Sequence, residues 1–316
     1  MGYTDSTYPG LTPAEMMKER KALIVDSVKL GHKPKRIPIM SNIWTWMIYD
    51  SPYGFTEALY DYDKMYDLVC KNHEKYEFDH YTYNGARNRM YFTDAFGKGT
   101  CYAINDEDYS INYFDASSVA DDDDYPTLLE KGYIKYYFEN ALPRKYGLKS
   151  KEEVMGCLEQ AIPAYIEQGE YSRRVSKQFT EVYGIPRQSA VHTEIPCDTL
   201  YKAIRGVRGF SADLRRREYF VEKSLDMIDE YYYPKLIRDL DNYKESDEVV
   251  LAASQTGLSH TILSPKQFEK YYWPYLKRYC DEVTKRGLIG KVFLEGDITP
   301  FIPFFQDLEP GHIILQ

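Results

Sequence analysis

The sequence predicts an α/β protein in which parallel strands alternate with helices. The C-terminal third carries the clearest pattern, because three short apolar runs alternate there with two segments of helical period. The connections between these segments are short. A series of strand, helix and strand with short connections requires parallel strands that are covered by helices. The three strands are expected at 248–253, 291–295 and 312–316.

The two helices between these strands have recognisable ends. The first is expected to begin at Ser264-Pro265, because serine accepts a bond from the free N–H groups of a first turn and proline fits position N1. Aromatic and aliphatic residues then recur with a helical period as far as Gly287, a typical stop. Pro274 lies inside this segment and should kink or divide the helix. The second helix is expected to begin at Thr299-Pro300.

The earlier part of the chain adds further strands and helices of the same kind. About six parallel strands result, whereas a closed (β/α)₈ TIM barrel needs eight. The chain ends directly after an apolar strand, so we expect either that the last two βα units are missing from this chain or that the sheet stays open. The earlier strands are expected at 37–40, 78–83 and 188–192. The earlier helices are expected at 12–30, 56–76, 151–168, 198–205 and 216–240, with an interruption in the last near Pro234.

One segment, 97–150, breaks this alternation. Two short runs of β-forming residues, 102–104 and 110–113, flank an acidic turn and predict a small antiparallel hairpin. We interpret the whole segment as an insertion over the ligand-binding edge of the sheet. The chain is otherwise expected to form a single domain over residues 1–316.

Composition excludes several classes of function. A net charge of −9 argues against nucleic acid as the main partner, because phosphate binding needs a basic surface. No apolar block approaches the roughly 20 residues of a membrane span, and the N-terminus has no apolar run of signal-peptide length. Five scattered cysteines without a CxxC motif suit a reducing cytoplasm. The 32 tyrosines indicate either a core that tolerates polar groups or an aromatic cavity for a planar ligand.

In a parallel α/β sheet, ligands are bound by residues at the carboxyl ends of the strands. This rule selects candidate residues before any motif is considered. The expected substrate-binding residues are Trp44, Tyr83, Asn84, His192 and Gln255, and the expected catalytic residues are Glu295, Asp297 and His260.

The strongest local signal is the turn Glu295-Gly296-Asp297 after the strand at 291–295. One of its carboxylates could act as a general acid or base, its pKa raised by burial. Glu295 is also the candidate metal ligand. The alternative is structural: Asp297 caps the helix that begins near Thr299, and Glu295 pairs with a neighbouring cation. The motifs GxGxxG, GxSxG, HExxH and the Walker sequence are absent, which argues against the enzyme classes that they mark.

The order of several segments resembles the uroporphyrinogen decarboxylase (URO-D) superfamily, which also contains cobalamin-dependent methyltransferases. The resemblance rests on Leu263-Ser-Pro-Lys-Gln-Phe268, Trp273-Pro-Tyr-Leu-Lys277 and the Gly-polar-x-Thr-Pro turn at 296–300. Supporting segments are 36–38, 204–210 with Asp213, and 60–79. The insertion, which ends in Leu142-Pro-Arg144, and the turn at Glu295 look more like the methyltransferase members.

The resemblance implies a (β/α)₈ barrel with its site at the carboxyl ends of the strands. For the methyltransferase members it implies transfer of a methyl group between a small O-methyl or N-methyl compound and a cobalamin cofactor, often carried by a separate corrinoid protein. Glu295, with Asp297 or His260, would then supply a proton to the leaving group or hold a metal ion. Trp44, Tyr83 and Gln255 would line the substrate pocket.

Two departures from the superfamily bear on the alternatives. The decarboxylases grip their substrate with an arginine-rich loop, and the corresponding segment 41–46 has no arginine. Decarboxylation of a cyclic polycarboxylate is therefore the second hypothesis, and a non-catalytic barrel that binds a small molecule is the third. The zinc-dependent members carry His-x-Cys-Gly where this chain has Phe293 and Glu295. Zinc is thus a possible cofactor without a standard ligand motif.

Overall fold

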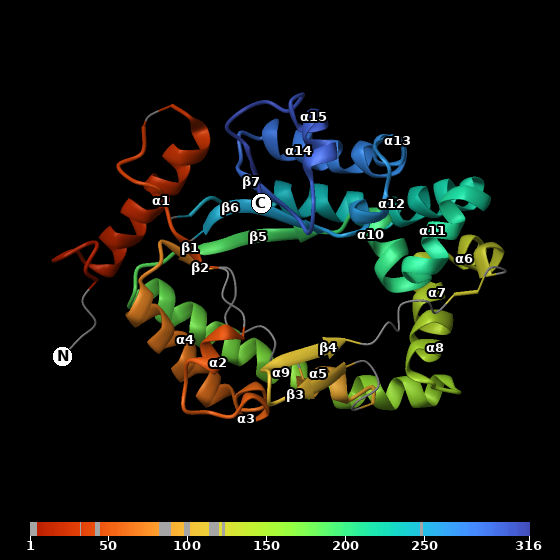
Figure 1. Cartoon of the computed structure of the whole chain (residues 1–316), viewed down its shortest axis with the longest axis horizontal. Coiled ribbons are helices and arrows are strands. Elements are labelled where there is room, and N and C mark those ends of the chain that lie inside the picture. The colour runs from red at the N-terminus through yellow and green to blue at the C-terminus, as the bar shows by residue number, and fades with distance from the viewer. Residues whose placement is uncertain are drawn as a thin grey trace.

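The chain forms an α/β structure around parallel strands (Figure 1). The computed structural model describes residues 5–31, 33–41, 45–81, 90–97, 102–113, 120–121, 124–246 and 249–316. The helices are α1(Pro13–Lys29), α2(Trp46–Tyr49), α3(Phe55–Leu59), α4(Tyr62–Tyr76), α5(Met90–Asp94), α6(Tyr125–Lys131), α7(Tyr133–Tyr136), η3(Tyr137–Ala141), α8(Leu142–Tyr146), α9(Lys151–Glu181), α10(Pro196–Thr199), η4(Leu200–Arg205), α11(Gly206–Arg216), α12(Glu218–Asp241), η5(Ser259–Ile262), α13(Pro265–Gln267), η6(Phe268–Tyr272), α14(Trp273–Thr284), η7(Thr299–Phe301) and α15(Ile302–Phe305).

Four strands form one parallel sheet in the order β5-β6-β7-β8. A second parallel pair, β1-β2, lies against this sheet, because β2 packs beside β5. The fold is therefore α/β with parallel strands and is compatible with a TIM-like barrel, although the described strands do not themselves close a ring. The strands are β1(Met40–Ser41), β2(His80–Tyr81), β5(Arg187–Thr193), β6(Val249–Gly257), β7(Gly290–Leu294) and β8(Ile313–Leu315).

The predicted hairpin is present as an antiparallel pair, β3(Tyr102–Asn105) and β4(Ser110–Tyr113). The helices that follow it lie beside η4 and α11, next to the carboxyl end of β5 (Figure 1). The backbone N–H of Ala120 donates to the carbonyl of Ile204 at 3.1 Å, and the Tyr125 hydroxyl donates to Asp213 at 2.6 Å. These bonds fasten the start of α6 to η4 and α11.

The two prolines inside predicted helices behave differently. Pro274 lies in the first turn of α14, directly after the π-helix η6, so the helical run from Pro265 to Thr284 continues but changes its hydrogen-bond pattern there rather than dividing in two. Pro234 lies inside α12, which runs without a break from Glu218 to Asp241, so the predicted interruption is wrong. The buried face of α12 continues on both sides of Pro234. Packing therefore keeps the helix continuous although one backbone hydrogen bond is lost.

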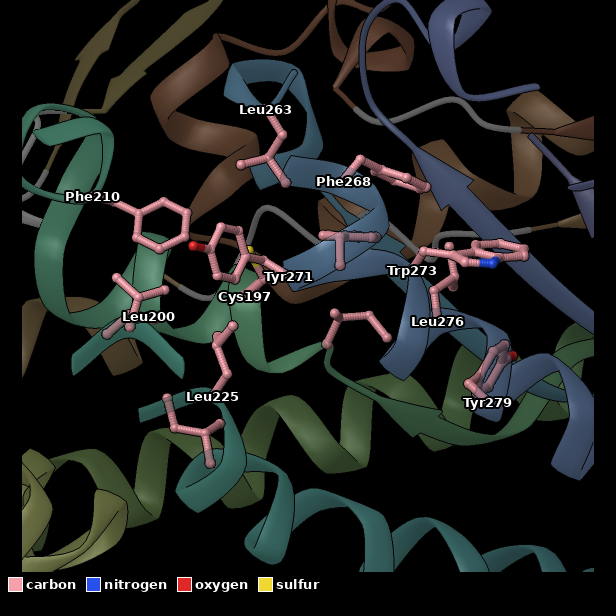
Figure 2. Close-up of a cluster of buried hydrophobic side chains, with 14 of the residues drawn as sticks. Cys197, Leu200, Phe210, Leu225, Leu263, Phe268, Tyr271, Trp273, Leu276 and Tyr279 are labelled. Atoms are coloured by element: carbon pink, nitrogen blue, oxygen red, sulfur yellow. The ribbon is translucent and has the colours of Figure 1, made fainter. Parts of the chain in front are cut away.

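The main hydrophobic core lies between β5–β7 and the helices that cover them. Phe268 stacks on Phe301 with ring centroids 4.3 Å apart, and Figure 2 shows it near Leu276 and Trp273 in this cluster. A second core joins α2, α3 and α4 to α9. Several buried tyrosines donate hydrogen bonds to carboxylates, for example Tyr272 to Asp198 at 2.8 Å. For these residues the structure supports the interpretation of a core that tolerates polar groups.

In the described part of the chain, no helix combines the length and the apolar character that crossing a bilayer requires. The four described cysteines are free thiols.

Replacing Gly184 by Ala is expected to destabilise the fold by about 2–5 kcal/mol. Gly184 has a φ of +59°, and a Cβ atom there would lie 2.3 Å from the backbone oxygen of Pro13. A backbone oxygen cannot move aside as a side chain would. Urea unfolding of the variant measures the loss. The matched control is Gly169→Ala in α9, where a Cβ meets nothing within 4 Å and should stabilise the helix slightly.

Candidate active site

A row of three polar residues crosses the parallel sheet. His192 on β5 is paired with Ser254 on β6, and Ser254 is paired with Lys291 on β7. Directly paired residues of neighbouring strands present their side chains on the same face, with strands about 4.8 Å apart. His192, Ser254 and Lys291 therefore form one continuous polar row, which we call the cross-strand row.

The cross-strand row lies on the face of the sheet that is turned away from α14. A Cβ atom built on Gly290 would lie 3.1 Å from the Tyr279 hydroxyl of that helix, and Val292 belongs to the core cluster that α14 completes. Because side chains alternate along a strand, Lys291 and Phe293 point to the opposite face. In a TIM-like barrel, with which the fold is compatible, the face turned away from the helices is the inner one.

His192 is the accessible end of the row. Its side chain is 53% exposed, its Nδ1 lies 3.3 Å from Ser254 Oγ, and its Nε2 lies 3.7 Å from Glu194 Oε1. Lys202 donates to the other oxygen of Glu194 at 2.8 Å. Burial alone would raise the pKa of the Glu194 carboxyl, but the bonds from His192 and Lys202 outweigh burial and hold this pKa below its usual value. Glu194 is therefore an anion that orients His192.

Lys291 is the buried end of the row, with 4% of its surface exposed. Burial lowers the pKa of its amine to about 8. Among the described residues no carboxylate lies within ion-pair distance of Nζ, and the centroid of the Phe293 ring is 5.9 Å from it. An amine of this kind can exchange a proton near neutral pH.

His80 on β2 is a second buried titratable group near Lys291. It is fully buried, and neither ring nitrogen has a hydrogen-bond partner in the described part of the chain. Burial, followed by the positive charge of Lys291, lowers the pKa of His80 to about 3. At neutral pH, His80 is therefore an uncharged imidazole close to an amine.

Stability is expected to fall as the pH drops below about 6.5. Burial lowers the pKa of His73 and of His80 from 6.5 to about 3, so between these values the unfolded chain binds protons that the folded chain does not. At pH 5 each histidine should cost about 2 kcal/mol of stability. Urea unfolding at pH 7.5 and pH 5 measures this loss, and His73→Phe should remove about half of it. Equal stability at both pH values would contradict the prediction.

The two carboxylates predicted to act at the end of β7 are both exposed. Asp297 accepts a hydrogen bond from the backbone N–H of Thr299 at 2.9 Å, and its bonds with Thr299 lower the pKa of its carboxyl. This bond lies at the start of η7, whose N-cap residue is Ile298, so Asp297 has a local structural role close to the one that the structural alternative proposed. Glu295 follows Lys291 and Phe293 with a period of two, and its backbone N–H donates to the Gly257 carbonyl at 3.0 Å. Its carboxylate makes no ion pair with a described residue.

Gln255 and His260 are buried on the helix-covered side of the sheet. Gln255 is paired with Val292, so its side chain faces away from the cross-strand row. The ring of His260 lies 6.0 Å from that of Tyr272 and 5.9 Å from that of Phe301. Burial lowers the pKa of His260, while Asp198 and the backbone of Glu295 act in the opposite direction. Both side chains are thus separated by the sheet from His192 and Lys291.

Three predicted binding residues, Trp44, Tyr83 and Asn84, lie outside the described residues. Lys291, Ser254, His80 and Glu194 were not among the predicted site residues. The signal for Lys291 was its position as the charged residue of a short apolar strand. Its place beside Ser254 follows from the strand register.

The site does not fit a structural or catalytic zinc ion. Within the described ranges, no three His, Cys, Asp or Glu side chains gather closely enough to hold a metal ion. Glu295 is exposed and Phe293 offers no ligand atom.

Comparisons with known proteins show a similarity in structure. Neither the protein-family models nor the curated proteins match the chain. Among solved structures, the chain is similar to a methyltransferase from Methanosarcina mazei, with a TM-score of 0.53 and 14% sequence identity. The similarity covers 93% of this chain and 75% of the methyltransferase. At this identity the similarity shows a shared fold.

Proposed function

We propose that this protein is a methyltransferase that moves a methyl group from a small O-methyl or N-methyl compound to a reduced corrinoid carried by a partner protein. The fold shared with a methyltransferase over most of the chain supports the class of reaction. The observation that carries the proposal is Lys291, a buried amine with a pKa of about 8 on the inner face of the sheet. A proton donor of this kind stabilises the charge that develops on a departing oxygen or uncharged nitrogen when its bond to the methyl carbon breaks.

The chemical step is a displacement at the methyl carbon. The nucleophile forms a bond to this carbon, the carbon–heteroatom bond breaks, and its electron pair stays on the departing oxygen or nitrogen. Lys291 gives its proton to that atom, which leaves a neutral amine. A phenol has a pKa near 10, so a lysine with a pKa of about 8 transfers a proton to a departing phenolate favourably. A phenolate is less basic than an alkoxide and therefore departs more readily, which favours aryl methyl ethers among the candidate donors.

The remaining residues of the cross-strand row orient the substrate. His192 reaches solvent at one end, and Ser254 lies between it and Lys291. The anionic Glu194 fixes the ring of His192, so that an imidazole N–H or the Ser254 hydroxyl can bond to a polar substituent of the substrate. His80 is uncharged at neutral pH, so it does not form an ion pair with the Lys291 ammonium group. The Lys291 proton is therefore available to the substrate.

The experiment is incubation with reduced cobalamin and a panel of aryl methyl ethers, alkyl methyl ethers and methylamines. Transfer is detected by the change in the cobalt absorption spectrum and by the demethylated product. The proposal expects turnover with at least one donor class, fastest for aryl ethers. Release of CO₂ from a cyclic polycarboxylate, with no cobalt methylation by any donor, would replace it with the decarboxylase hypothesis.

Replacing Glu295 by Gln separates the two candidate proton donors. Glu295 is exposed beyond the end of β7, whereas Lys291 is buried in the row. If Lys291 is the donor, Glu295→Gln should lower kcat by less than about 10-fold, well below the effect expected for a general acid. A loss of about 100-fold or more would assign the proton transfer to Glu295. Single-turnover methylation of cobalamin is the measurement.

A further inference from the structure

A second cavity lies apart from the cross-strand row, among α7, η3, the start of α9 and α12. Its volume is about 930 Å³, within the range of small-molecule sites. The walls are mainly apolar and include Tyr133, Leu148, Val154, Leu158 and Met227. None of these residues belongs to the cross-strand row.

The rim of this cavity carries unpaired positive charge. Lys135, Lys149 and Lys151 line it, and none of the three has its amine within 4 Å of a carboxylate in the described part of the chain, although Lys135 and Lys151 help Lys131 to lower the pKa of Glu139. The fourth lysine, Lys131, pairs with Glu139 at 3.0 Å. Four lysines and two glutamates thus surround the cavity, a local excess of two positive charges in a chain whose net charge is −9.

Several large apolar side chains at this cavity are incompletely covered. Ile134, Phe138 and Met155 are 38–46% exposed although they line its walls. Exposed apolar side chains that gather at one cavity mark a binding site more often than isolated ones do. Phe138 lies on the π-helix η3, a local geometry that is frequent at functional sites.

We propose that this cavity binds a carboxylic acid with an apolar body, such as a medium-chain fatty acid or a hydrophobic aromatic acid. The walls exclude water from the body, and the free ammonium groups of Lys149, Lys151 and Lys135 pair with the carboxylate at the rim. A neutral molecule would leave these charges unpaired, and a cation would be repelled. The adaptable side chains of Met155 and Met227 suit a flexible hydrocarbon chain.

This site goes beyond the proposed methyl transfer, but it adjoins the same region of the fold. Tyr133 lines the cavity, and its ring lies 6.1 Å from that of Tyr232. Tyr232 and Glu194 line a narrow cleft at the end of β5. An occupant of the cavity would therefore contact Tyr133, whose ring packs near that of Tyr232 in this cleft.

Calorimetric titration of the full chain with dodecanoate, dodecanol and dodecylammonium, each below its aggregation concentration, tests the proposal. Dodecanoate should bind tightest and dodecylammonium weakest. The double variant Lys149→Gln, Lys151→Gln should weaken dodecanoate about 3- to 10-fold, as expected for two exposed ion pairs, without affecting dodecanol. The matched control is Lys266→Gln, an exposed lysine of α13 outside the cavity, which should change nothing.

A second pair of variants tests the location without removing charge from the rim. Met155→Glu places a carboxylate among the apolar walls and should abolish dodecanoate binding. Ile162→Glu, at an exposed position of the same helix outside the cavity, should leave binding unchanged. Equal affinity for dodecanoate and dodecanol, no binding of either, or equal loss in both glutamate variants would overturn the proposal. None of these results depends on methyl transfer, so the two proposals fail separately.

Discussion

Replacing Lys291 by Met is expected to lower the rate of methyl transfer by about 100- to 10,000-fold, the contribution typical of a general acid. The side chain of Met has nearly the length of the lysine stem and no proton to give. Lys291→Arg should be equally inactive, because a guanidinium stays protonated and cannot act as the donor. In the wild type, kcat should fall as the pH rises through about 8, where the Lys291 amine loses its proton. Single-turnover rates between pH 6 and 9 measure both effects.

The same variant should be more stable than the wild type at pH 7. The pKa of Lys291 is lowered from 10.5 to about 8, so below pH 8 the folded chain bears the full cost of a buried charge, at most about 3 kcal/mol. Between about pH 8 and 10.5 the unfolded chain binds a proton that the folded chain does not, and the stability of the wild type rises with pH. The advantage of Lys291→Met should therefore shrink across this range.

This combination of lost activity and gained stability distinguishes a functional lysine from a structural one. A lysine that held the fold together would destabilise the protein when replaced. Lys266→Met, at an exposed position outside the row, is the control for the substitution itself and should change neither property. A Lys291→Met variant with normal kcat would remove Lys291 from the mechanism, and a variant less stable at pH 7 would show that the amine has a stabilising partner.

The parallel strands could be predicted from the sequence because each is a short apolar run between clear helix signals. The predicted run at 291–295 and the observed β7 differ by one residue at each end. The capping interaction of Ser264 could be predicted for the same reason, since a helix start depends on neighbours in the sequence. Features that depend on tertiary packing were harder to predict, as the unbroken helix through Pro234 illustrates.

In the candidate site too, features set by the local sequence could be predicted and features set by tertiary packing could not. His192 could be found because it ends a predicted strand, but its neighbours in the row come from strands that are distant in sequence. Strand register decides that Ser254 rather than Gln255 shares its face, and a shift of one residue reverses this assignment. Register depends on packing against helices such as α14, which no local pattern reveals. Asp297 illustrates the opposite case, because its capping bond to Thr299 is local and was one of the alternatives considered.

Replacing Asp213 by Ala is expected to destabilise the protein by about 3–5 kcal/mol. Asp213 is fully buried and accepts hydrogen bonds from Arg205 Nε at 2.6 Å, from Arg217 Nη1 at 3.2 Å and from the Tyr125 hydroxyl at 2.6 Å. Arg205 is itself 3% exposed, so removal of the carboxylate leaves an uncompensated charge in the core. Urea unfolding measures the loss. Asp281→Ala, which removes an exposed carboxylate paired with Lys277, should change stability by less than about 1 kcal/mol.

The loss of stability when Asp213 is replaced should be larger in some elements than in others, because this carboxylate joins two parts of the chain. Tyr125 begins α6, whereas Arg205 and Asp213 belong to η4 and α11 at the carboxyl end of β5. Hydrogen exchange in Asp213→Asn should therefore increase first in α6, while β6 and β7 keep their protection. Asn can still accept one bond, so this variant should lose less stability than the alanine variant. A uniform increase in hydrogen exchange across the sheet would show instead that the carboxylate supports the whole core. In that case, this hydrogen-bond network would not be the specific attachment of α6 to η4 and α11.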